Sequence, residues 1–249
     1  MLVLGDGLLG NAFKPFAKVL AKSECDITAR SDVEQALDKY QPKVLINCAG
    51  IVPKHPSGMM NMFQVNAYAP HLLEIECQRR GIKLVHISTN CVFGKDGPYS
   101  EYSETHPTDL YGMSKLLGEP KQDIKTLVIR TSLVGLPDPK GRGLLAWASR
   151  QSSLVGFDRV LWNGVTTKEL VNQILLLTNQ NKYGIVHVAS NETLSKFELL
   201  ELAKDIFKWD VTIGKESALI ERPHVENKTL LAEQGLVTKS LRQQLKELT

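Results

Sequence analysis

The residues MLVLGDGLLG, at positions 1–10, combine a strand and a glycine-rich turn. Met1–Gly5 is a short apolar run ending in glycine, which predicts a buried strand. Gly5–Gly10 then fits the pattern G-x-G-x-x-G. In that pattern the first glycine makes a tight turn, the second lets the backbone approach a pyrophosphate, and the third lets a helix pack on the strand. The helix N-terminus faces the phosphates. The segment predicts a dinucleotide site, the alternative being a strand–helix turn without a ligand.

Further runs of β-branched residues and leucine predict buried strands, because strands covered on both faces are continuously apolar. These runs are Ala17–Lys22, Lys43–Ala49, Lys83–Ser88, Thr126–Thr131 and Gly184–Ala189. Strands that alternate with helical stretches predict an α/β fold, a Rossmann-type doubly wound parallel sheet with helices on both sides.

The helical stretches have recognisable ends. The pattern S/T-x-x-E is typical of a capping box and occurs at Ser31, where the helix would run to Tyr40, and again at Thr166 and Ser195. Other predicted helices are Ala67–Arg80, ended by Gly81, then Tyr111–Ile124, disturbed or ended by Pro120, and Ser240–Leu248.

The regular alternation weakens after residue 135, where prolines and glycines mark a loop at Pro137, Pro139, Gly141 and Gly143. We therefore expect a dinucleotide-binding Rossmann core over residues 1–135. Residues 136–249 would form a small C-terminal substrate-binding lobe, interleaved with late core elements such as the strand near 184–189.

The composition is that of a globular protein: 43% of the residues are hydrophobic, 23% are charged and the net charge is +3. A charge this mild and dispersed predicts no nucleic-acid surface. No apolar run reaches the ~18 residues of a membrane span, and no basic n-region opens the chain. Neither the four cysteines nor the six histidines show metal-ligand spacing. We expect a soluble cytoplasmic protein without a membrane partner or a metal.

Two aromatic and two imidazole side chains are interpreted as core residues. His86 and His187 lie within predicted strands, and Trp147 and Trp162 are expected to serve packing more than sugar stacking.

Tyr111 and Lys115 are four residues apart, which places both on one face of a helix. A phenol has an ordinary pKa of about 10, and a neighbouring ammonium lowers it. The pair is therefore suited to proton transfer, the alternative being a half-buried aromatic and a solvated lysine. Ser88-Thr89-Asn90 follows a predicted central strand, where ligands of open α/β sheets bind.

Lys22 and Ser23 follow the predicted second strand, with Glu24 close by. A carboxylate at this place suits a ribose 2′-hydroxyl, whereas a basic residue suits a 2′-phosphate. Lys22 slightly favours NADPH over NADH, the alternative being an exposed lysine at a strand end.

Taken together, these motifs resemble the extended short-chain dehydrogenase/reductase family, and within it the dTDP-4-dehydrorhamnose reductase-like nucleotide-sugar 4-ketoreductases. The segments that carry the resemblance are GDGLLG (Gly5–Gly10), CDIT (Cys25–Thr28), VLINCAG (Val44–Gly50), VNAYAP (Val65–Pro70), HISTNCVFGKDGPYSE (His86–Glu101), YGMSKLLGE (Tyr111–Glu119), VIRTSLVG (Val128–Gly135) and WNGVTTKEL (Trp162–Leu170).

The resemblance implies NAD(P)H-dependent reduction of the C4 ketone of a nucleoside-diphosphate deoxysugar, in the synthesis of surface polysaccharide sugars. Tyr111 would protonate the ketone oxygen as hydride arrives, and Thr89 would hydrogen-bond the same oxygen. Lys115 would lower the pKa of Tyr111 and bind the nicotinamide ribose.

The motifs and the resemblance together predict which residues contact the ligands. Cofactor contacts would be Gly5, Gly7, Leu8, Leu9, Gly10, Lys22, Asp26, Ile27, Cys48, Ala49, Gly50, Ser88, Tyr111 and Lys115. Substrate contacts would be Asn90, Cys91, Val92 and Arg222. Relatives often have Asp-Tyr where this chain has Asn90-Cys91, a departure that touches the sugar pocket.

The residues after Thr89 also bear on other functions that are known for this scaffold. A 4,6-dehydratase places Asp-Glu after the threonine, and Asn90 and Cys91 cannot transfer protons in that way. A nucleotide-sugar epimerase stays open, as does a non-catalytic NADP-binding regulatory subunit like that of methionine adenosyltransferase. Relatives often pair through helices beside the Tyr-x-x-x-Lys helix, so a homodimer is possible.

Overall fold

The computed structural model describes residues 1–52, 58–120, 125–136, 141, 143–217, 226–232, 236 and 238–249. Among the predictions, Arg222, Pro137, Pro139 and residues 121–124 of the predicted helix Tyr111–Ile124 lie outside these ranges.

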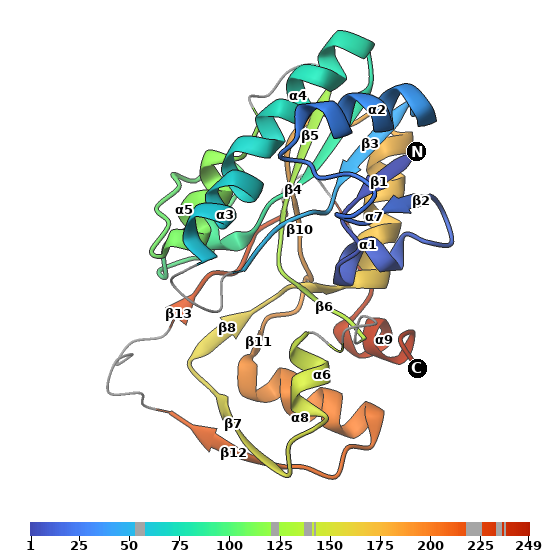
Figure 1. The fold of residues 1–249 in the computed structure, drawn as a ribbon. Coiled ribbons are helices and arrows are strands. Elements are labelled where there is room, and N and C mark those ends of the chain that lie inside the picture. Colours follow the sequence, from blue (N-terminus) through green and yellow to red (C-terminus); the bar gives the residue numbers. More distant parts are fainter. Residues whose placement is uncertain are drawn as a thin grey trace.

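A six-stranded sheet in the order β10-β5-β4-β3-β1-β2 forms the centre of the molecule (Figure 1). All of its strand pairs are parallel. The strands are β1 (Leu2–Leu4), β2 (Lys18–Leu20), β3 (Val44–Asn47), β4 (Lys83–Ile87), β5 (Thr126–Thr131) and β10 (Gly184–Val188). The strand order reverses between β1 and β3, and such a switch point opens a crevice at the carboxyl edge of the sheet. The predicted fold class is confirmed.

Helices cover both faces of the sheet, because alternate strand residues point to opposite sides. On one face Leu2, Leu4 and Leu45 pack in a core that includes residues of α2 (Arg30–Tyr40) and α4 (Ala69–Arg80). The opposite face, with Val3 and Ile46, packs against α1 (Leu8–Ala12) and α7 (Thr167–Asn179). The strands are therefore buried on both sides, as their continuous apolar character predicts.

Most predicted helix ends are found where the sequence places them. Gly81 ends α4 in a left-handed conformation, with φ of 68°. Ser195 forms a full capping box with Glu198, and the side chain of Thr166 accepts a hydrogen bond from the amide of Glu169. The last helix, α9 (Leu241–Lys246), is capped by Ser240.

The predicted capping box at Ser31 is wrong. Helix α2 begins at Arg30 with Ala29 as its N-cap, and no side chain caps it. The amide of Val33 donates to the carbonyl of Ala29, which places Ser31 inside the first turn. The next residue, Asp32, accepts a hydrogen bond from the amide of Asp26 at 3.1 Å, so a contact with the preceding loop holds this helix end.

The helix that carries Tyr111, α5 (Leu110–Leu117), ends before Pro120, as the proline predicts. It packs beside α3 (Met59–Phe63) and the π-helical turn Gln64–Tyr68 that leads into α4.

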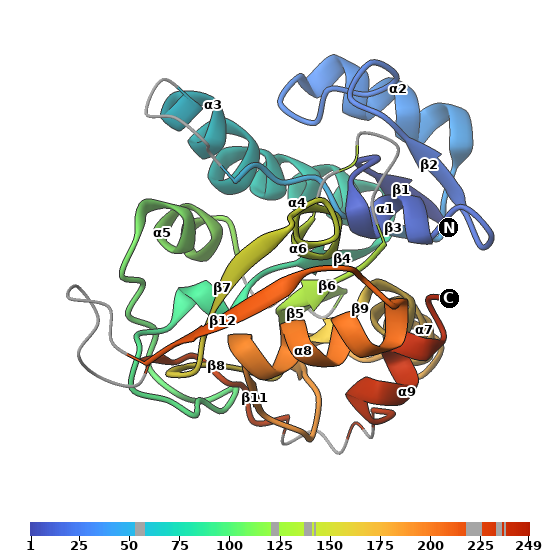
Figure 2. The same ribbon diagram turned by 90° about the horizontal axis from the view of Figure 1, so that it is seen from below.

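A smaller group of elements lies beyond the carboxyl ends of the sheet strands (Figures 1 and 2). Strand β5 leads directly into it, and β10 leads into it again. Its members are β6 (Leu133–Val134), α6 (Leu144–Ala148), β7 (Ser153–Phe157), β8 (Val160–Trp162), β9 (Val165–Thr166), β11 (Leu194–Ser195), α8 (Lys196–Phe207), β12 (Thr212–Glu216), β13 (Glu226–Asn227) and α9. Trp162 is buried among Val134, Leu145 and Leu199, which confirms its packing role.

Within the described residues, no helix combines the length and apolar character needed to cross a bilayer.

Candidate active site

The glycine-rich turn has the geometry that its sequence predicts. Gly5 has φ of +97°, and a side chain there would come within 2.7 Å of the backbone of Ala49. A Cβ on Gly10 would overlap the carbonyl oxygen of Gly5, so the close approach of α1 to this turn needs a glycine. A Cβ on Gly7, in contrast, would have no atom within 4 Å. Gly7 therefore presents open backbone to the crevice.

Two adjacent cavities follow the carboxyl edge of the sheet. The larger has a volume of about 1090 Å³ and the smaller one of about 200 Å³. Both are lined by Gly7 and by Cys48–Gly50, the residues that follow β3. The two cavities together therefore form one extended cleft across the switch point.

Most predicted contact residues line this cleft. In the larger cavity these are Gly7, Leu8, Cys48, Ala49, Gly50, Ser88, Thr89, Asn90, Cys91, Tyr111 and Lys115. In the smaller cavity they are Gly5, Gly7, Lys22, Asp26, Ile27, Cys48, Ala49 and Gly50. The side chains of Leu9 and Val92 are buried in hydrophobic clusters instead, so a ligand contact there would have to come from backbone.

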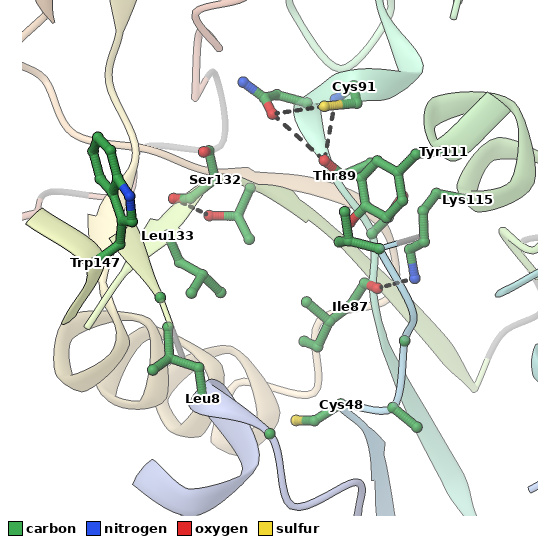
Figure 3. A pocket seen from close by; sticks show the side chains of 18 of the residues that line it. Leu8, Cys48, Ile87, Thr89, Cys91, Tyr111, Lys115, Ser132, Leu133 and Trp147 are labelled. Atoms are coloured by element: carbon green, nitrogen blue, oxygen red, sulfur yellow. Dashed lines mark hydrogen bonds between the residues drawn. The ribbon is translucent and has the colours of Figure 1, made fainter. Parts of the chain in front are cut away.

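Tyr111 is brought to Thr89 by the close packing of α5 on the short helix Asn90–Val92. A Cβ on Gly112 would overlap the carbonyl oxygen of Cys91, so this glycine permits the approach. Asp109 caps α5 by accepting a hydrogen bond from the amide of Gly112 at 2.7 Å. The side chains of Tyr111 and Thr89 lie beside each other and both line the larger cavity (Figure 3).

Burial raises the pKa of Tyr111 to about 12, with smaller contributions from Cys91 and Asp109 in the same direction. The predicted lowering of this pKa by Lys115 is therefore wrong. Burial outweighs every opposing interaction, and the ammonium of Lys115 donates elsewhere, to the carbonyl of Ile87 at 2.7 Å. Tyr111 is consequently a protonated phenol at neutral pH, which is the state required of a proton donor.

Lys115 is buried to 4% exposure below Tyr111 on the same helix. Its Nζ also lies 3.4 Å from Nε2 of His86. Burial lowers the pKa of Lys115 to about 8, although the charges of Glu119 and Cys48 act in the opposite direction. Its ammonium is thus close to balance with the free amine in the physiological pH range.

Ser88 is held by a buried ion pair. Its hydroxyl donates to Glu119 at 2.6 Å, and the same carboxylate receives two hydrogen bonds from Arg130, at 2.9 and 2.7 Å. The guanidinium also lies over the ring of Phe93. This network joins β4, β5 and the end of α5, so it fixes the strand end from which Thr89 projects.

The smaller cavity carries the charged residues expected at an adenosine end. Nζ of Lys22 lies 3.3 Å from Asp26, and the amide and hydroxyl of Thr28 both donate to the Asp26 carboxylate, at 3.0 and 2.7 Å. These Thr28 hydrogen bonds are the main reason why the pKa of Asp26 is lowered.

The opposite wall of the larger cavity is formed by residues that the sequence analysis did not assign to the site. Trp147 is 48% exposed and faces the cavity from α6, across from Tyr111 (Figure 3). Arg150 and Gln151 follow it in the same wall. The prediction that Trp147 serves packing is therefore wrong. A weak signal was present, since Trp147 is the one large aromatic in an otherwise aliphatic helix, LLAWA.

The substrate candidates Asn90 and Cys91 lie at the end of β4. Nδ2 of the Asn90 side chain donates to the carbonyl of Lys228 at 3.0 Å, which ties this turn to the segment after β13. Among the described residues, no group of three or more His, Cys, Asp or Glu side chains has the arrangement of a metal site.

The sequence of this chain is similar to those of several known proteins. A family model described as the RmlD substrate binding domain matches residues 4–224. A dTDP-4-keto-6-deoxy-D-glucose reductase of Streptomyces niveus is 27% identical over 195 residues, which cover 74% of this chain and 67% of that protein. A dTDP-4-dehydrorhamnose reductase of Mycolicibacterium smegmatis is 32% identical over 194 residues, which cover 72% of this chain and 58% of that protein.

Solved structures show the same fold. The dTDP-4-dehydrorhamnose reductase of Bacillus anthracis, determined in complex with NADP, superposes with a TM-score of 0.87 at 22% identity, covering 99% of this chain and 97% of that chain.

Proposed function

We propose, since the chain belongs to the RmlD substrate binding domain family, that it reduces the C4 ketone of a nucleoside-diphosphate-activated deoxysugar with NADPH or NADH. This reaction would belong to the synthesis of surface polysaccharide sugars. One observation carries the proposal: Tyr111 and Thr89 line the same cleft as the open glycine turn and Lys115.

The residues present fit a nicotinamide dinucleotide. Gly7 leaves its backbone uncovered at the turn, where a pyrophosphate would bind. Cys48–Gly50 line both cavities, so one extended ligand can pass along them from the adenosine end to Lys115. Lys22 lines the smaller cavity and would favour the additional phosphate of NADPH. The bound nicotinamide would supply the hydride.

The protein would supply the proton. With a pKa of about 12, Tyr111 keeps its proton until a ketone oxygen gains negative charge. Thr89 would hold that oxygen beside the phenol. Positioned proton transfer of this kind contributes roughly 10²–10⁴-fold to an enzymatic rate. Lys115 would hold the ribose of the cofactor and return a proton to Tyr111.

The sugar nucleotide would bind between the strand end and the smaller group of elements that lies beyond the carboxyl ends of the sheet strands. Asn90 and Cys91 line the cavity on the sheet side. Trp147 and Arg150 line it on the lobe side, and they suit a flat ring and a diphosphate respectively.

A homodimer is also part of the proposal. Apolar side chains are exposed on α4 and α5, namely Ile75 at 50%, Leu110 at 47%, Met113 at 43% and Leu117 at 56%. Two copies could cover this surface by pairing these helices, and Leu117→Glu should then produce monomers in size-exclusion chromatography. We also expect a cytoplasmic location, which suits the free thiols of this chain.

The decisive experiment is a spectrophotometric screen of keto-sugar nucleotides with NADPH and NADH in parallel. The proposal requires stoichiometric consumption of cofactor and formation of a C4 alcohol. Interconversion of sugars without net cofactor consumption would establish an epimerase instead. Cofactor binding without turnover across the panel would establish a regulatory subunit.

A further inference from the structure

A buried chain of hydrogen-bonding groups connects the cofactor side of the cleft with Lys115. The amide of Ala49 donates to Oδ1 of Asn47 at 3.1 Å. Nδ2 of Asn47 lies 3.2 Å from Nδ1 of His86, its partner across β3 and β4. Nε2 of His86 then lies 3.4 Å from Nζ of Lys115. Asn47 and His86 are fully buried.

The direction of this chain follows from its first link. A backbone N–H can only donate, so the atom of Asn47 that faces Ala49 is the oxygen. The NH₂ group of Asn47 therefore faces His86 and donates to Nδ1. A neutral imidazole has one donor and one acceptor nitrogen, so His86 carries its proton on Nε2. Burial, the neighbouring Lys115 and His71 all lower the pKa of His86 well below 6.5, which keeps the ring neutral.

The series of hydrogen-bonding groups therefore ends with the Nε2–H donor of His86, which faces Nζ of Lys115. An ammonium has three donors and no acceptor, whereas a free amine has a lone pair. The Nε2–H of His86 can therefore be satisfied only when Lys115 has lost a proton. Glu119 and Cys48 favour the ammonium instead, and Tyr111 lies one helical turn before Lys115.

We propose that His86, oriented by Asn47, is a positioning residue that stabilises the unprotonated amine of Lys115 and so enables Lys115 to restore the proton of Tyr111. This inference rests on the proposed reduction. In that reaction Tyr111 gives its hydroxyl proton to the ketone oxygen and becomes a phenolate. The ammonium of Lys115 then gives one proton, through a water molecule, to the phenolate oxygen. The resulting amine accepts the hydrogen bond of His86 until it takes a proton from solvent.

A second buried histidine offers an internal comparison. Nδ1 of His187, on β10, lies 3.0 Å from the carbonyl oxygen of Leu231. A carbonyl only accepts, so His187 carries its proton on Nδ1. The two buried strand histidines are therefore expected to be opposite tautomers, and only His86 belongs to the chain that reaches Lys115.

The first test is the ¹⁵N NMR spectrum of histidine-labelled full-length protein at pH 7, assigned with His86→Gln and His187→Gln. We expect a protonated Nε2 and an unprotonated Nδ1 for His86, and the reverse for His187. A protonated Nδ1 on His86 overturns the inference. This measurement needs no substrate, so its result tests the tautomer of His86 independently of whether the protein catalyses the proposed reduction.

The second test is the pH profile of kcat. A carboxylate from Asn47→Asp can accept from both Ala49 and Nδ1–H of His86, which turns Nε2 into an acceptor for the ammonium. The alkaline limb of the profile should move up by about one pH unit, a tenfold change in the protonation equilibrium. His86→Gln, whose amide can still accept and donate, should keep the limb near its wild-type position, and so should His187→Gln.

An unmoved limb in folded Asn47→Asp would contradict the inference. Folding is checked by unchanged His187 signals. If Asn47→Asp does not fold, the inference is tested by the tautomer of His86 in the wild type and by the pH profile of His86→Gln. A shifted alkaline limb of kcat in His86→Gln would contradict the role of the Nε2 donor.

Discussion

Replacing Lys115 by methionine should abolish turnover and at the same time stabilise the fold near neutral pH. The side chain is 4% exposed, and burial lowers its pKa from 10.5 to about 8. Between these two values the unfolded chain holds a proton that the folded protein has released. At about 1.4 kcal/mol per pH unit, the buried ammonium costs the folded state about 3 kcal/mol at pH 7.

The sign of the pH dependence follows from the same two pKa values. The unfolded state binds more protons between pH 8 and 10.5, so the stability of the wild type rises with pH across this window. The penalty falls to about 1 kcal/mol by pH 10. Lys115→Met lacks the titrating group and should show no such gain. Its advantage at pH 7 should be about 2 kcal/mol, because the hydrogen bond to Ile87, worth about 1 kcal/mol, is lost.

The assay is urea unfolding of both proteins at pH 7 and pH 10. Lys196, whose pKa burial also lowers to about 8, is present in both and cancels in the difference. Lys14→Met, at an exposed position, serves as the matched control and should shift stability equally at both pH values. An equal wild-type-to-Lys115→Met difference at pH 7 and pH 10 would refute the reasoning about this buried ammonium.

Three further predictions concern the cleft. Tyr111→Phe should lower kcat by roughly 10²–10⁴-fold with cofactor affinity retained in calorimetry; an unchanged kcat would remove Tyr111 from the mechanism. Gly10→Ala should lower the melting temperature, because its Cβ would overlap the carbonyl of Gly5, whereas Gly7→Ala, which has room, should keep the melting temperature and weaken only cofactor binding. Trp147→Ala should leave stability within about 0.5 kcal/mol, as expected of an exposed side chain, and raise KM for the sugar nucleotide about tenfold; an unchanged KM would place Trp147 outside the substrate site.

Local sequence patterns were sufficient to predict the strands, the glycine-rich turn and the helix of the nucleotide-binding core. The positions of the sheet strands along the chain, the turn at Gly5–Gly10 and the joint position of Tyr111 and Lys115 on one helix all follow from short-range rules of sterics and periodicity. Such features depend on residues a few positions apart, so they can be read before the chain is folded. The resemblance then assigned Thr89 to the same site, and the structure places it there.

Other properties arise only when distant segments meet. The pKa of Tyr111 rises because α5 is packed against residues 89–92. The effect of this burial is larger than the lowering of the pKa that the i,i+4 spacing of Lys115 predicted. Trp147 reaches the cleft because folding brings it to the wall opposite Tyr111, which lies 36 positions earlier in the chain. The tautomer of His86 depends on Asn47 in a neighbouring strand. Burial, electrostatics and cavity walls are properties of surfaces brought together by folding, and periodicity along one segment contains no information about the partner it will meet.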